Sequence, residues 1–155
     1  MKRIGIVYLF TISVISSLSC EISCKQVRAK ISFGELVDKI TILTIKKERI
    51  SDPEKLNNVT RELDLLLKLF HEYIGDRDDI ALLMEELKIT NEILWDVEDE
   101  LRIKERLKEF GEDFIKLARS VYVTNDKRCA LKRSIDSLLD SHIVEEKSYA
   151  SLTYS

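Results

Sequence analysis

The fold is decided by one long uninterrupted stretch, residues 80–111, which reads IALLMEELKITNEILWDVEDELRIKERLKEFG. It contains no proline, and its first glycine is Gly111. Apolar side chains recur at intervals of three and four, which is the period of one face of a helix. They are Ile80, Leu83, Leu87, Leu94, Val97 and Leu101, with Thr90 filling one step. The pattern predicts a helix from about residue 80 to residue 110, ended by Gly111 and roughly 45 Å long.

A first helix is predicted upstream, beginning after Ser32. Ser32 and Glu35 have the spacing of a capping box, in which each side chain bonds the backbone N–H of the other residue. Residues 40–45 are rich in β-branched side chains, which favours a strand. We nevertheless predict a helix, because the charged run 46–49 continues without a turn signal.

A second helix is predicted from the pair Asp52 and Pro53. Asp52 suits the N-cap, and Pro53 suits the first helical position, where its missing N–H costs nothing. Gly75 is expected to end this helix. Its apolar seam resembles that of a coiled coil and comprises Leu56, Val59, Leu63, Leu66, Phe70 and Tyr73.

A fourth helix is predicted from about Glu112 to Leu139. It is expected to continue through Asn125, because Leu131 and Ile135 keep the helical phase beyond it. With four Gly and one Pro in 155 residues, the chain lacks the turn residues that sandwiches and barrels need. The predicted fold is therefore all-α, an antiparallel helical bundle or long helical hairpin of about four helices.

The N-terminus differs from the rest of the chain. A cationic start is followed by an uncharged run over residues 4–20, with small side chains at the −3 and −1 positions before Cys20. This order is typical of a secretory signal. We expect a signal peptide or hydrophobic leader (1–19), a linker (20–30), a helical domain (31–149) and a C-terminal tail (150–155). The protein is then exported, to the periplasm or outside the cell. The open alternatives are an uncleaved leader that anchors the chain in the membrane, a lipid at Cys20, and a misassigned start with a cytoplasmic protein.

Charge is distributed unevenly between the third and fourth predicted helices. Residues 76–100 hold ten acidic and two basic side chains, whereas residues 116–133 hold six basic and one acidic. The two helices could complement each other, or the basic one could face a phosphate or carboxylate ligand. Asn125, Arg128 and Lys132 share a face with apolar side chains, so a cation buried there must be paired. The candidate ligand-binding residues are Asp38, Lys39, Glu98, Arg102, Arg119, Asn125, Arg128 and Lys132.

No catalytic constellation is visible in the sequence. It has only two histidines and three cysteines, no zinc-binding spacing and no glycine-rich phosphate loop. We predict no metal ligands and no cofactor, and the net charge of −3 makes nucleic acid an unsuitable partner. The favoured function is a non-catalytic helical binding or interaction module, with an unknown protein partner or self-association. The alternative is a small helical enzyme or receptor that binds an anionic ligand in a cationic inter-helix site.

Several segments resemble an uncharacterised bacterial family of small helical proteins. They read GELVDKITIL (34–43), LWDVED (94–99), FIKLARSVYVTND (114–126), LKR (131–133) and EEKSY (145–149). The similarity covers residues 31–149 and implies a domain of unknown function, with no reaction to transfer. Members usually begin near the first helix, so the leader departs from the pattern. A fainter similarity, confined to residues 36–49, is to the first helix of helical chorismate mutases, which bind a dicarboxylate between cationic side chains.

Overall fold

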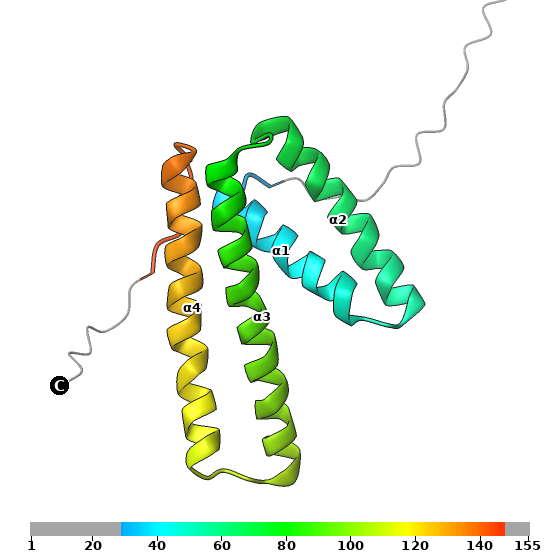
Figure 1. Ribbon diagram of the computed structural model, residues 1–155, viewed down its shortest axis with the longest axis vertical. Helices are drawn as coiled ribbons and strands as arrows, with labels where there is room; N and C mark the ends of the chain where they lie inside the picture. The colour runs from blue at the N-terminus through cyan, green and yellow to red at the C-terminus, as the bar shows by residue number, and fades with distance from the viewer. Residues whose placement is uncertain (1–28, 148–155) are drawn as a thin grey trace, which may run out of the picture.

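The computed structural model describes residues 29–147, which form a long helical hairpin with a shorter one packed obliquely against it (Figure 1). The helices are α1 (Phe33–Arg49), α2 (Pro53–Tyr73), α3 (Asp78–Leu107) and α4 (Glu112–Leu138). No strand occurs in this range. The prediction of an all-α antiparallel arrangement is confirmed.

The predicted leader and the C-terminal tail lie outside the described residues, as do Cys20 and Cys24. Export therefore stays a prediction. It would be tested by the mass of the protein from its native host, which should lack the first nineteen residues. None of the four helices is both long and apolar enough to cross a bilayer.

The start of α1 is capped from two sides. The Ser32 hydroxyl accepts a hydrogen bond from the Glu35 N–H at 3.1 Å, which is one half of the predicted capping box. The other half is wrong, because the Glu35 carboxylate accepts instead from Lys132 of α4. The Gly34 N–H donates to Asp136 of α4 at 2.6 Å. The first turn of α1 is thus fixed both by its own cap and by a distant helix.

The ends of the other helices follow local backbone chemistry. Asp52 caps α2 by accepting from the Lys55 N–H at 2.9 Å, as predicted, and Gly75 stops α2 with a φ of +70°. The predicted end of α3 at Gly111 is wrong. Lys108 takes the left-handed conformation, with a φ of 58°, and its N–H bonds the last carbonyls of α3. Gly111 serves as the N-cap of α4 instead.

The fourth helix continues through Asn125, as predicted. The Asn125 side-chain amide donates to the Val121 carbonyl at 3.0 Å, within its own helix. The polar side chain therefore bonds the helix rather than interrupting it.

The core forms around α1, which packs against α2, α3 and α4. The core side chains are Leu36, Val37, Ile40, Leu43, Val59, Leu63, Ile74, Ile80, Leu87, Leu131 and Ile135. Among the four helices, α2 packs only against α1. Tyr73, at the end of the predicted α2 seam, is consequently 63% exposed, which corrects its assignment to the core side. The α3–α4 hairpin continues well beyond the part that α1 covers (Figure 1).

Candidate functional site

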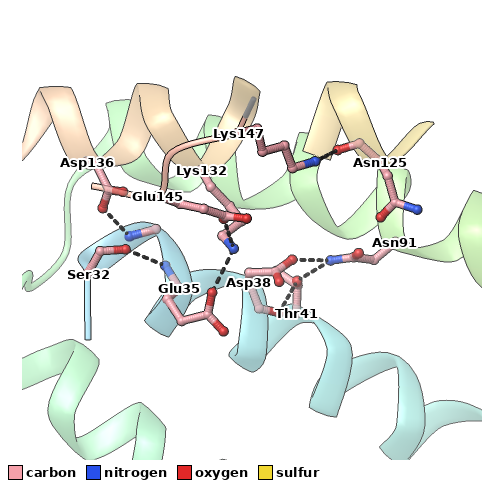
Figure 2. A network of polar contacts seen from close by, with 11 residues as sticks. Ser32, Glu35, Asp38, Thr41, Asn91, Asn125, Lys132, Asp136, Glu145 and Lys147 are labelled. Atoms are coloured by element: carbon pink, nitrogen blue, oxygen red, sulfur yellow. Dashed lines mark hydrogen bonds and ion pairs between the residues drawn. The ribbon is translucent and has the colours of Figure 1, made fainter. Parts of the chain in front are cut away.

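A buried lysine connects three segments of the chain (Figure 2). Lys132 of α4 is 5% exposed, and its ammonium donates to Glu35 of α1 at 2.6 Å and pairs with Glu145 of the C-terminal segment. Burial works to lower the pKa of Lys132, but the hydrogen bonds to Glu145 and Glu35 together outweigh it and raise that pKa. The same contact lowers the pKa of Glu145. The prediction that a buried cation on this face of α4 would be paired is confirmed.

A second polar group joins α1 to α3 beside Lys132. Asp38 is 4% exposed, and the Asn91 amide donates to it at 2.9 Å and to the Thr41 hydroxyl oxygen at 3.0 Å. The Thr41 hydroxyl in turn donates to the Asp38 carbonyl at 2.8 Å. Burial raises the pKa of the Asp38 carboxyl, and the Asn91 hydrogen bond and the charges of Arg128 and Lys132 oppose this rise. These contacts hold the carboxyl group at a fixed place between the helices.

The segment that follows α4 folds back along it. Besides the Glu145 contact, Glu146 pairs with Arg133 at 2.5 Å. Lys147 donates to the Asn125 carbonyl at 3.2 Å and lies 3.9 Å from Asp126. Ion pairs with α4 thus hold this segment against it, although the segment has no helical period in the sequence.

A groove of about 380 Å³ opens next to these polar contacts, between α1, α3 and α4. We call it the ligand groove. Its apolar walls are Ile42, Ile45, Leu94 and Trp95, and its polar members are Asn91, Glu98, Asp99, Arg102 and Arg128. The Arg49 guanidinium lies 5.7 Å from the centre of the Trp95 ring and also pairs with Asp96. The groove therefore combines an apolar surface with two arginines.

Arg128 is the available cation of the ligand groove. It is half-buried, yet between residues 29 and 147 its guanidinium makes no ion pair or hydrogen bond. Asp38 and Glu145 attract it only at longer range. Arg102, by contrast, pairs with Glu98 at 2.7 Å. A half-buried arginine without a carboxylate partner is a natural place for an external oxyanion.

The candidate residues fall into three groups. Asp38, Asn125 and Lys132 belong to the internal polar contacts, whereas Glu98, Arg102 and Arg128 line the ligand groove. Two candidates lie elsewhere. Lys39 points outward and pairs with Glu62 of α2 at 2.6 Å, and Arg119 is exposed on α4 outside the ligand groove.

Only a small part of the opposite charge on α3 and α4 forms ion pairs between those two helices. α4 does lie beside α3, and Lys127 pairs with Glu86 at 3.0 Å. The other paired cations of this stretch of α4 turn to different partners: Lys116 to its own helix, Lys132 to α1, and Arg133 to the C-terminal segment. Arg128 forms no ion pair among the described residues and lines the ligand groove.

Sequence reasoning missed several residues of this region. A Cβ at Gly34 would lie 2.5 Å from the Lys132 carbonyl oxygen, so glycine at this position permits the close approach of α1 to α4. Asp136 and Glu145 were not expected at the site, because their partners are far away in sequence. Within residues 29–147, no three His, Cys, Asp or Glu side chains gather in a way that could hold a metal.

The match to a protein-family model spans all of the described residues. Residues 27–154 match a family of unknown function, DUF6165. The chain belongs to this family. No curated protein and no solved structure matches it. The segments that carried the family resemblance meet at the site: they supply Asp38, Trp95, Asn125 and Lys132. The similarity to chorismate mutases stays a prediction.

Proposed function

We propose that this DUF6165 member is a non-catalytic binding module whose ligand groove takes a small anion with an apolar body. The observation that carries the proposal is Arg128, a half-buried guanidinium among apolar walls with no carboxylate partner in the described chain. Its planar fork matches the geometry of a carboxylate or phosphate head group. Ile45, Leu94 and Trp95 would cover the apolar body.

The size and charge of the groove narrow the class of ligand. A volume of about 380 Å³ is within the range of small-molecule sites. Glu98 and Asp99 also line the groove, so a second anionic group on the ligand, away from the head at Arg128, would meet repulsion there. A single oxyanion head at Arg128 with an aromatic or aliphatic tail satisfies both constraints.

Binding fits the neighbouring ionisable groups better than catalysis does. Asp38 is held by Asn91, and Lys132 is held between two glutamates. A general acid or base must be free to exchange a proton with its substrate. These two groups are already engaged in holding the helices together, so they are structural supports of the groove.

The proposal is tested by a thermal-shift screen with matched probes. Benzoate and phenyl phosphate carry both a ring and an oxyanion, whereas acetate and inorganic phosphate lack the ring. We expect the ring-bearing anions to raise the Tm with a saturable dose dependence, since ligand at roughly 100 times its Kd adds about 2.7 kcal/mol. The smaller anions should have much weaker effects.

The variant Arg128→Ala should lose this shift. Arg119→Ala is the control, because it removes an exposed arginine of the same helix outside the groove. A shift that is equal in Arg128→Ala and in the unaltered protein, or no shift with any anion, would contradict the proposal.

A further inference from the structure

The open half of the α3–α4 hairpin, which α1 does not cover, is only two helices thick (Figure 1). It holds a second groove, of about 350 Å³, which we call the arm groove. Its apolar members are Leu101 of α3 and Phe114, Ala118 and Val121 of α4, and its charged members are Glu98, Arg102 and Glu105 of α3. A small anion bound at Arg128 would leave this apolar surface without a role.

The arm groove and the ligand groove adjoin and form one trough. Both are lined by Glu98 and Arg102, which lie where the two grooves meet. On α4, Arg128, Val121 and Phe114 follow one another at steps of seven residues, close to two helical turns, and therefore share one face. The trough extends from Arg128 to Phe114, a distance of roughly 21 Å along α4.

The charged side chains of the arm groove already have partners. Arg102 pairs with Glu98 at 2.7 Å, and Glu105 pairs with Lys108 at 2.9 Å. Arg128 is thus the only cation lining the trough that has no carboxylate partner among residues 29–147. A ligand that occupies the whole trough therefore meets an available cation at one end and mainly apolar side chains beyond it.

We infer that the trough binds a single-chain amphiphile, such as a fatty acid or a monoalkyl phosphate, with its head at Arg128 and its alkyl chain in the arm groove. This inference rests on the proposed function, because it places the head at the same arginine. It adds that the apolar body is a long chain rather than a ring. Apolar side chains line the trough two turns apart on each helix, Leu94 and Leu101 on α3 and Val121 and Phe114 on α4.

The experiment measures the Kd of hexyl, octyl, decyl and dodecyl phosphate for the full chain, each below its critical micelle concentration. Trp95 fluorescence in the ligand groove reports the binding of every member of the series. A fully buried methylene group improves the affinity about fourfold, and a chain in an open groove keeps one side in water, so we expect about twofold per methylene. Dodecyl phosphate should therefore bind roughly 50-fold more tightly than hexyl phosphate.

A matched pair of variants locates the alkyl chain. Ala118→Glu places a charge in the arm groove, at an exposed position about 15 Å along α4 from Arg128. It should change the Kd of hexyl phosphate less than about twofold, because surface charges this far apart are largely screened. The gain from hexyl to dodecyl should fall below about fivefold, because the chain would meet a charge.

Ala130→Glu is the control, since it adds the same charge at an exposed position outside both grooves and nearer to Arg128 in the sequence. It should keep the full gain from hexyl to dodecyl phosphate. Circular dichroism melting checks that each variant is folded.

The outcomes distinguish this inference from the proposed function. Binding that depends on Arg128 but has the same Kd for hexyl and dodecyl phosphate would overturn the inference and leave the proposed function in place. A chain-length gain that Ala118→Glu retains would also overturn it, because the chain would then lie elsewhere. The absence of binding to every alkyl phosphate, whether or not the protein cosediments with phosphatidylglycerol vesicles, would contradict both.

Discussion

The two halves of the α3–α4 hairpin are made of the same two helices and differ in what covers them. Every buried residue of α3 lies between Ile80 and Leu94, and every buried residue of α4 lies between Cys129 and Asp136. This is the half against which α1 packs (Figure 1). The difference shows that α1, packed against α3 and α4, rather than the hairpin itself, creates the core.

The polar contacts along the hairpin differ in a related way. In the covered half several of them join different helices: Asn91 reaches Asp38, and Lys132 reaches Glu35. Beyond Asp96, which still pairs with Arg49 of α1, the ion pairs of α3 stay within that helix and its C-terminal end, as in the pair of Glu98 and Arg102. Contacts between helices select one packing arrangement, whereas pairs within a helix stabilise whatever arrangement is present. The covered half therefore specifies the fold.

The largest effect should come from removing apolar volume in the covered half. Leu87 is fully buried, so Leu87→Ala should lower the free energy of unfolding by about 3 kcal/mol. The same change at Leu107, which is 62% exposed in the open half, should cost less than about 0.5 kcal/mol. Urea denaturation of both variants measures the difference. Equal losses would mean that the two halves contribute equally to the core.

A smaller effect is expected from adding one methyl group at Gly34. The new Cβ would meet the Lys132 backbone, which cannot move as a flexible side chain can. Gly34→Ala should destabilise the fold by about 2 kcal/mol through overpacking. Gly111→Ala is the control, since no neighbouring atom lies within 4 Å of the place that its methyl group would take, and it should cost less than about 1 kcal/mol. A neutral Gly34→Ala in thermal or urea unfolding would show that α1 and α4 are not held at this distance.

The smallest predicted effect is a change in the stability of the fold with pH. Burial raises the pKa of Asp38 above its ordinary 3.8, so the folded state binds this proton more tightly than the unfolded state. The stabilisation is complete below pH 3.8 and is lost as the pH rises through the raised value. Asp38→Asn keeps an oxygen for Asn91 but does not titrate. The stability of the unaltered protein relative to this variant should therefore fall as the pH rises above 3.8, as measured by urea midpoints at several pH values. A stability of the unaltered protein, relative to Asp38→Asn, that stays constant or rises with pH would contradict this prediction.

Local patterns in the sequence predicted the helices well. The caps at Ser32 and Asp52 and the continuous α4 follow from interactions within a few residues, and these are visible in the sequence. The apolar period also predicted which face of α3 is buried, since Ile80, Leu87 and Leu94 are among its buried residues.

Contacts between distant segments were harder to predict. Glu35 has the spacing of a capping box, but Lys132 competes successfully for its carboxylate. Lys108 ended α3 before Gly111 could, although a lysine in the left-handed conformation has no distinct sequence signal. The candidate residues on α4 were identified from their shared face, but only the packing of α1 shows that Lys132 is enclosed while Arg128 remains available.

The central claim, that the groove beside Arg128 binds an oxyanion with an apolar body, is tested most directly by fluorescence. Trp95 is the single tryptophan of the sequence and lines the groove, so its emission reports on occupancy. Titration with phenyl phosphate should give a saturable change in the unaltered protein and in Arg119→Ala, and no change in Arg128→Ala. An unchanged emission in the unaltered protein, or the same saturable change in Arg128→Ala, would contradict the claim.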